Sequence, residues 1–278
     1  MAIIDDTMFA AILENLDRIE QDHEVRILYA VESGSRAWGF ASRNSDYDVR
    51  FIYIHQPNWY LSIRERRDVI ECPISGDLDI SGWDLRKALG LFSKSNPPML
   101  EWLGSPLIYR DTGNLAGRLR EILTSSFSQE RCMYHYLHMA RGNYREFLKG
   151  EVVRLKKYLY VLRPLLACLW IEKHGSTPPT EFAKLVADAG LSITLTLAID
   201  ELLARKMSGD ELDTSAKIPE LNDFIRQMLE KYTLLSGKRP TPVTDVELLD
   251  QLFREMLHAL WSTEPRSEIL DLCPKDRT

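Results

Sequence analysis

The sequence predicts an α+β fold, in which a small mixed β-sheet with flanking helices is followed by an all-helical domain. Two observations support this prediction. Short apolar runs bounded by turn residues, which are typical of strands, are concentrated before about residue 110. After about residue 128, apolar residues recur mainly at the spacing of amphipathic helices. We therefore assign residues 1–125 to a sheet-containing domain and residues 126–278 to a helical domain.

The first half is predicted to interleave helices with strands. Its elements, in chain order, are a helix at 7–22, strands at 25–33, 47–54, 67–72 and 77–82, helices at 84–94 and 97–103, a strand at 106–109 and a helix at 112–124. Asp84 is a suitable N-cap for the helix that follows it. Pro97 and Pro98 end that helix and suit the first turn of the next one.

The second half is predicted to be helical throughout. Its helices are expected at 128–149, 152–173, 179–188, 192–206, 218–236 and 243–262. Gly175 and the pair Pro178 and Pro179 separate two of them, because glycine and proline both disfavour helix interiors. The polar stretch 208–217 is expected to be an exposed loop, and the charged tail from Pro265 to be loosely ordered.

Composition excludes several classes of protein. A hydrophobic content of 45% in 278 residues is ample for a buried core. No apolar run reaches the ~18 residues needed for a transmembrane helix, and the acidic N-terminus lacks the features of a signal peptide. Four cysteines without metal-type spacing indicate reduced structural thiols, so we expect a cytoplasmic protein with no membrane partner. The net charge of −6 argues against a broad phosphate-binding surface but allows a local basic groove.

A Gly-Ser turn follows the first predicted strand. Gly34 lacks a Cβ, so its backbone can approach a ligand closely or adopt dihedral angles that other residues avoid. Ser35 adds a hydroxyl donor, and a short helix beginning at Arg36 would direct free N–H groups towards an anion. Trp38 and Phe40 are expected to pack beneath the turn. The turn is therefore predicted to bind phosphate groups.

Two carboxylates open the next predicted strand. Asp46 and Asp48 are one residue apart and would point to the same side of the strand, while Tyr47 would point to the other. Paired carboxylates suit Mg²⁺, with Mn²⁺ as the alternative, and Mg²⁺ completes its coordination with water and substrate phosphates. Such ions can polarise a phosphate, activate a hydroxyl and stabilise a leaving pyrophosphate. The order of strand, turn and acidic strand thus predicts transfer of a nucleotide from a nucleoside triphosphate (NTP).

A third carboxylate is expected on the strand predicted at 77–82. Asp77 and Asp79 share one face of that strand, and either could lie beside the first pair if the two strands are neighbours. We favour Asp79, which lies further into the strand, as metal ligand and general base, with Asp77 as the alternative. Gly-Ser turns and Asp-x-Asp pairs are each common, but their combination with a later strand aspartate is much rarer.

These residues resemble the signature of the polymerase-β-type nucleotidyltransferase superfamily, which consists of Gly-Ser, a spacer, Asp-x-Asp and a third Asp on a later strand. The chain is most similar to the RNA-ligase-associated, RlaP-like branch, through residues 34–40, 45–50, 79–87, 96–103 and 156–167. The resemblance implies a nucleotidyltransferase core in the first half. Through the association with RNA ligases it also suggests an RNA 3′ end as acceptor, and a protein hydroxyl is equally compatible with the three acids.

Further candidate nucleotide contacts are basic and aromatic. Lys156, Tyr160 and Arg163 fall at positions i, i+4 and i+7 of a predicted helix, so they share one face that could hold phosphates and stack on a base. The alternative is a solvated helix face whose aliphatic stems pack on neighbouring apolar residues. Arg36 lies in the Gly-Ser turn and Arg50 shares the alternation of the two carboxylates, so both are expected to face phosphate.

Two other functions compete with this interpretation. The helical half could be the interface of a non-catalytic, antitoxin-like or regulatory protein. Arg131 followed by His138 on a predicted helix also resembles, loosely, the pattern of HEPN-type RNases, and metal-independent RNA cleavage would then centre on these two residues. An arginine and a histidine often occur in one helix by chance, so we favour the nucleotidyltransferase.

Overall fold

The computed structural model describes residues 4–208, 214–235 and 245–262, so the tail predicted from Pro265 and residues 209–213 of the predicted loop lie outside it. The first half contains helices α1 (Asp6–His23), α2 (Gly34–Trp38), α3 (Pro57–Tyr60), α4 (Leu85–Phe92), α5 (Pro97–Leu103) and α6 (Leu115–Ser126), and strands β1 (Val25–Glu32), β2 (Tyr47–His55), β3 (Val69–Glu71), β4 (Leu78–Asp84) and β5 (Ile108–Asp111). The second half contains helices α7 (Gln129–Phe147), α8 (Lys156–His174), α9 (Phe182–Asp188), α10 (Ile193–Met207), α11 (Pro219–Leu235) and α12 (Val246–Trp261), and strands β6 (Val152–Arg154) and β7 (Thr214–Ala216). The predicted α+β fold is confirmed.

The first half is built on a five-stranded mixed sheet with the strand order β3-β4-β2-β1-β5. Strands β2 and β4 run parallel, whereas the other neighbouring pairs are antiparallel. Helix α4 follows β4 directly, and it begins at the predicted N-cap Asp84, whose carboxylate accepts a hydrogen bond from the backbone N–H of Arg86. The sheet therefore sets β2 and β4 side by side, with their N-terminal ends at the same edge.

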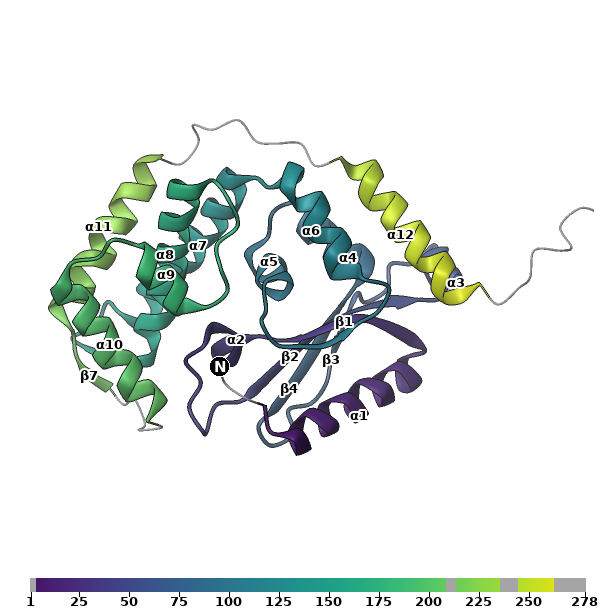
Figure 1. Cartoon of the computed structure of the whole chain (residues 1–278), viewed down its shortest axis with the longest axis horizontal. Coiled ribbons are helices and arrows are strands. Elements are labelled where there is room, and N and C mark those ends of the chain that lie inside the picture. Colours follow the sequence, from purple (N-terminus) through teal and green to yellow (C-terminus); the bar gives the residue numbers. More distant parts are fainter. Residues whose placement is uncertain (1–3, 209–213, 236–244, 263–278) are drawn as a thin grey trace, which may run out of the picture.

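Two apolar cores lie on the two faces of this sheet. On one face, Ile12, Leu16 and Ile19 of α1 pack against inward side chains of β1 and β2, including Phe51. On the other face, α4, α5 and α6 share a larger core with helices α7, α8, α10, α11 and α12. Figure 1 shows the sheet with the green group of helices α8–α11 beside it, and α12 on the side away from that group. The two halves are thus joined by continuous packing.

Two short strands interrupt the predicted helical half. Val152–Arg154 pairs with Thr214–Ala216 as a small antiparallel sheet. The helix predicted at 152–173 therefore begins only at Lys156, because the β-branched pair Val152 and Val153 extends along a partner strand instead. The loop predicted at 208–217 supplies that partner.

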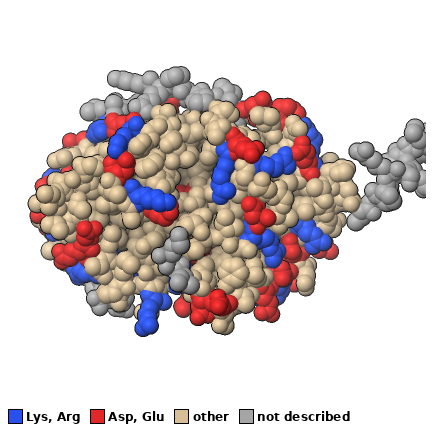
Figure 2. Space-filling view, viewed as in Figure 1, with Lys and Arg blue, Asp and Glu red and all other residues tan. Residues whose placement is uncertain are grey.

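Helix α12 returns to the sheet-containing half of the chain. It contacts α4, and the ring of Phe253 meets the ring of Tyr60 edge-on at 4.9 Å. Figure 2 shows that Lys, Arg, Asp and Glu side chains are interspersed over the visible face. Among the described helices, none combines the length and apolar character that crossing a membrane would require.

A buried polar cluster connects the Gly-Ser turn to the helical half. Glu101 of α5 accepts hydrogen bonds from the indole of Trp38 (3.3 Å), from the hydroxyl of Tyr136 (3.0 Å) and from the guanidinium of Arg163. Arg163 also donates to the carbonyl of Thr180 (3.2 Å) and lies over the Trp38 ring at 4.7 Å. The predicted nucleotide contact of Arg163 is therefore wrong, because this face of α8 is buried against α2 and α5 and leaves the Arg163 side chain only 3% exposed.

A second buried carboxylate, that of Asp84, joins β4 to α12 through Tyr60. The Tyr60 hydroxyl donates to Asp84 Oδ2 at 2.6 Å, and the Tyr60 ring packs on Phe253. Burial raises the pKa of Asp84 to about 6.

Replacing Arg163 with alanine should lower the free energy of unfolding in urea by about 3–5 kcal/mol, because Glu101 would stay buried without its cation. The double variant Glu101→Gln/Arg163→Met removes both charges and should recover most of that loss. A stable Arg163→Ala protein that had lost only nucleotide affinity would instead support the role predicted from the sequence.

Asp84 should make the protein less stable as the pH rises through the interval from about 4 to 6. A carboxyl group whose pKa is raised by folding stabilises the folded state while it is protonated, and this contribution of about 3 kcal/mol is lost as it ionises. Asp84→Asn keeps an acceptor oxygen for the backbone N–H of Arg86 but cannot ionise. Its free energy of unfolding, measured in urea, should therefore fall less than that of the wild type over the same pH interval. The exposed Asp223→Asn serves as the control, and an equal pH dependence in all three proteins would contradict the assignment.

Candidate active site

The Gly-Ser turn and the carboxylate of Asp48 are in direct contact. Gly34 has φ +58°, and a Cβ at this position would lie 2.0 Å from Asp48 Oδ2, so only glycine fits here. The backbone N–H of Ser33 donates to the carbonyl of Asp48 at 2.8 Å. The hydroxyl of Ser35 is half-buried and makes no hydrogen bond to any residue that the structure describes. Helix α2 is five residues long and begins at Gly34 rather than at the predicted Arg36, so Gly34 and Ser35 form its first turn.

The parallel pairing of β2 and β4 brings Asp48 and Asp79 together. The two residues are direct partners in the register, which confirms that these strands are neighbours. The guanidinium of Arg50 bridges them, with 3.2 Å to Asp48 Oδ1 and 2.8 Å to Asp79 Oδ2. Arg50 therefore faces the carboxylates, as predicted. Asp77, the alternative third acid, uses its backbone carbonyl to accept from the N–H of Tyr47.

Asp46 lies in the loop just before β2 and is exposed. Burial raises the pKa of Asp48, and the negative charges of Asp79 and Asp46 raise it further, while Arg50 and Arg36 oppose these effects. Asp48 thus lies close enough to Asp79 and to Asp46 to be affected by the negative charge of each. A group of acids in this state is stabilised by a cation.

The three carboxylates fit a divalent cation by their chemistry. All are hard oxygen donors of the kind that Mg²⁺ prefers, and two of them already share one cation, the guanidinium of Arg50. In the ranges that the structure describes, no three His, Cys, Asp or Glu side chains are arranged as a ready-made metal site. Arg50 occupies the carboxylates of Asp48 and Asp79, so a cation bound there would have to compete with its guanidinium.

Arg36 supports the loop that carries Asp46. Its guanidinium donates to the carbonyls of Ser45 (2.7 Å) and Asp46 (3.2 Å) and lies 3.6 Å from the centre of the Tyr47 ring. The residue is 8% exposed. In this structure Arg36 directs two of its donor nitrogens at backbone carbonyls and stacks on an aromatic ring, and its phosphate contact stays a prediction.

The helical half contributes a tyrosine and two lysines beside the acids. Tyr160 is 40% exposed and packs edge-on against Trp38, and the charges of Asp48 and Asp46 help to raise its pKa after burial. Lys156 is exposed at the start of α8. The predicted positions of Tyr160 and Lys156 on the site-facing side of α8 are consistent with this arrangement.

Lys206 was not predicted from the sequence. Its ammonium group lies 3.3 Å from Ser45 Oγ and 3.4 Å from Ser42 Oγ. Burial and the nearby charge of Lys156 lower its pKa, while Asp46 has the opposite effect. No motif marks this lysine in the last turn of α10, so only the tertiary structure could reveal it.

Glu32, which was also not predicted from the sequence, holds the backbone of Asp48 in place by a hydrogen bond. It is fully buried at the end of β1, accepts from the backbone N–H of Asp48 at 2.9 Å, and accepts from the hydroxyl of Tyr109. Burial raises the pKa of Glu32 to about 7. The sequence did contain a signal, because a glutamate directly after the apolar run from Ile27 to Val31 must find polar partners if it is buried with that run.

The residues expected for RNA cleavage do not meet. Arg131 donates to the carbonyl of Ser93 at 3.2 Å, whereas His138 stacks on Tyr134 with 6.4 Å between ring centres. No hydrogen bond, ion pair or ring contact joins Arg131 to His138 among the described residues, so the structure gives the HEPN-type alternative no support.

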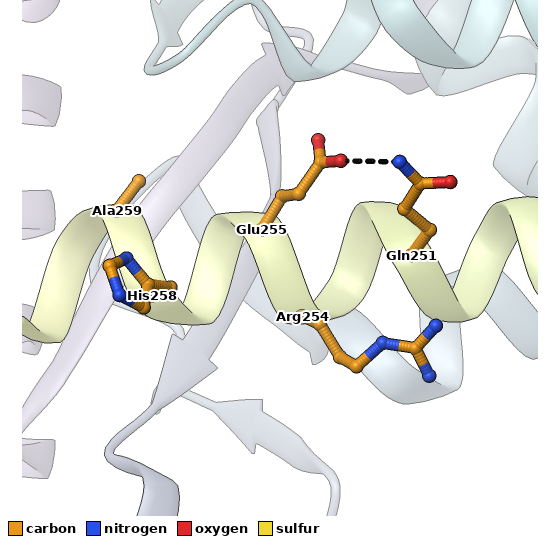
Figure 3. Close-up of a pocket in the computed structure, with 5 residues that line it drawn as sticks. All are labelled: Gln251, Arg254, Glu255, His258 and Ala259. Carbon is orange, nitrogen blue, oxygen red and sulfur yellow. Dashed lines mark hydrogen bonds between the residues drawn. The ribbon is translucent and has the colours of Figure 1, made fainter.

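Two surface hollows lie elsewhere on the described part of the chain. One, of about 420 Å³, is lined by Gln251, Arg254, Glu255, His258 and Ala259 of α12, whose side chains leave a single helix in different directions (Figure 3). Glu255 is paired with Arg118 and Arg254 with Glu247, so these charges are already compensated. The other hollow, of about 410 Å³, includes His55, at the end of β2 opposite to Asp48. Neither hollow includes the acids.

Comparisons with known proteins identify the family of this chain. The family model described as "RNA repair pathway DNA polymerase beta family" (RlaP) matches residues 8–255. The uncharacterized protein YcgL of Bacillus subtilis (strain 168) is 47% identical over 249 residues, which cover 90% of this chain and 95% of YcgL. The crystal structure of a nucleotidyltransferase-like protein from Exiguobacterium sibiricum 255-15 is similar over 87% of this chain and 80% of that one, with 14% identity and a TM-score of 0.33. The chain therefore belongs to the RlaP family of RNA repair pathway, DNA polymerase β-type proteins.

Proposed function

We propose that this protein transfers a nucleoside monophosphate from an NTP to a hydroxyl acceptor in a Mg²⁺-dependent reaction that releases pyrophosphate. Membership of a polymerase-β-type family supports a general nucleotidyl-transfer role. The observation that carries the proposal is the pairing of Asp48 with Asp79 beside a Gly-Ser turn that contacts Asp48 directly. The acceptor we propose is an RNA 3′ end, in keeping with the RNA repair family, with a protein hydroxyl as the alternative.

In this reaction Asp46, Asp48 and Asp79 would hold Mg²⁺ or Mn²⁺. The metal, when bound, supplies charge compensation for the triphosphate and for the developing negative charge. The acceptor oxygen attacks the α-phosphorus, the bond from that phosphorus to the pyrophosphate oxygen breaks, and Asp79 accepts the proton of the hydroxyl. No covalent bond to the protein is needed, because positioning and electrostatic stabilisation carry phosphoryl chemistry of this kind.

The remaining residues of the site would bind the nucleotide. Gly34 and the free hydroxyl of Ser35 would contact the β- and γ-phosphates at the turn. Lys206 and Lys156 bring positive charge to the same region from the helical half, and Arg50 stays within reach of phosphate when a metal takes over its carboxylates. The exposed ring of Tyr160 offers a surface on which a base can stack.

The double variant Asp46→Asn/Asp48→Asn should lose nucleotidyl transfer while remaining folded. The assay incubates the protein with each α-labelled NTP, Mg²⁺ and either total RNA or total protein, and follows both the label and pyrophosphate release. Each substitution keeps the side-chain shape but removes the negative charge that binds the metal. Asp77→Asn is the matched control and should stay active, whereas full activity of the double variant would reject the site.

The wild-type protein should release pyrophosphate under these conditions with at least one NTP. If the wild-type protein does not bind NTP in the presence of Mg²⁺, and releases no pyrophosphate with either total RNA or total protein, a non-catalytic, regulatory function would replace the proposal.

Replacing Arg50 with glutamine should make folding more dependent on Mg²⁺. Without the guanidinium, Asp48 and Asp79 repel one another, and loss of two partly exposed ion pairs should lower Tm by about 2–4 °C. Added MgCl₂ should raise the Tm of Arg50→Gln more than that of the wild type, as measured by differential scanning calorimetry. Arg67→Gln, which loses only the exposed pair with Glu71, is the control, and an identical response of all three proteins to Mg²⁺ would contradict metal binding at this site.

A further inference from the structure

We infer that a strip of basic side chains leading away from the acids is the docking surface for a single-stranded RNA acceptor. This basic strip consists of Lys206, Lys156, Lys157, Arg154 and Lys149. The inference rests on the proposed function for the role of the RNA as acceptor, but the binding itself can be tested without any turnover.

The strip is continuous from the catalytic acids to the small β6–β7 sheet. Lys206 interacts electrostatically with both Asp46 and Lys156, and Lys157 with both Lys156 and Arg154. These interactions link Lys206, Lys156, Lys157 and Arg154 in turn. At the outer end, pairing of β6 with β7 fixes the backbone of Arg154, and Lys217 donates to the carbonyl of Lys149 at 3.1 Å.

The charges of the strip are not compensated internally. None of its five side chains forms an ion pair with a carboxylate among residues 4–208, 214–235 and 245–262. Glu146 influences Lys157 electrostatically but lies beyond ion-pair distance. Some exposed cations elsewhere, such as Arg226 and Lys231, are paired with carboxylates. In a protein of net charge −6, a row of unpaired cations beside an active site indicates a polyanionic ligand.

Aromatic side chains accompany these cations. The ammonium group of Lys157 lies 4.0 Å from the centre of the Phe147 ring and 5.0 Å from that of Tyr160. Tyr160 is the aromatic residue nearest to the acids in this series and is 40% exposed. Cations beside an exposed ring such as that of Tyr160 suit a single strand, because the cations neutralise phosphates and the ring can stack on an unpaired base. An acidic protein surface would use the cations but offer no base for the ring.

The test is the binding of a fluorescein-labelled single-stranded RNA of about 12 nucleotides, without NTP, measured by fluorescence anisotropy at several salt concentrations. The variant Lys149→Ala/Arg154→Ala removes two cations at the end of the strip furthest from the acids. It should weaken binding at least about 10-fold and reduce the slope of log K against log[salt] by about 1.4, which is the value for two lost phosphate contacts on a single strand.

Arg64→Ala/Lys94→Ala is the matched control. Both residues are exposed, lie outside the strip and form no ion pair with a carboxylate of the described residues, so this variant removes the same charge and should bind RNA like the wild type. Tyr160→Leu should weaken binding without changing the salt slope, since it removes stacking and no charge. Equal weakening in both charge variants, or no measurable binding by the wild type, would overturn the inference. RNA binding that persists in the inactive Asp46→Asn/Asp48→Asn protein supports it, and failure of nucleotidyl transfer alone would leave this binding result unchanged.

Discussion

The site depends on one constraint, the parallel register that places Asp48 of β2 directly opposite Asp79 of β4. The negative charges of these two neighbouring carboxylates repel each other. The guanidinium of Arg50, which is also on β2, pairs with both and offsets this repulsion. Glu32 accepts a hydrogen bond from the backbone N–H of Asp48, and Gly34, which has no side chain, leaves room for the carboxylate of Asp48. The turn, the two strands and the internal cation therefore form one unit, in which each part restricts the position of Asp48.

The second organising interaction lies between the two halves of the chain. Glu101 binds Trp38, which follows the Gly-Ser turn, and also binds Tyr136 and Arg163 of the helical half. This buried cluster sets the position of α8 relative to the turn, and with it the position of Tyr160 beside the acids. The helical half is therefore part of the site, since it supplies an aromatic ring and the cations Lys156 and Lys206 that the sheet lacks.

Features set by residues near one another in the sequence were predicted well, because they follow from residue type and from the alternation of side chains along a strand. Alternation placed Arg50 with Asp48, and Asp84 was identified as an N-cap. Features that depend on distant partners could not be predicted. Lys206 meets Ser42 across 164 residues of sequence, and Val152–Arg154 extends only because a strand after residue 213 pairs with it. Arg163 was misinterpreted because helical spacing tells which residues share a face but not whether that face is buried.

We propose that Asp48 and Asp79 give up their ion pairs with Arg50 when they bind the metal ion that accompanies the nucleotide. Electron paramagnetic resonance of Mn²⁺, titrated into the protein with a non-hydrolysable NTP analogue, tests this exchange directly. Our account predicts protein-bound Mn²⁺ in the wild type and its loss in Asp79→Asn, because one of the paired carboxylates is then neutral. Absence of protein-bound Mn²⁺ in the wild type, or equal binding by Asp79→Asn, would contradict the account.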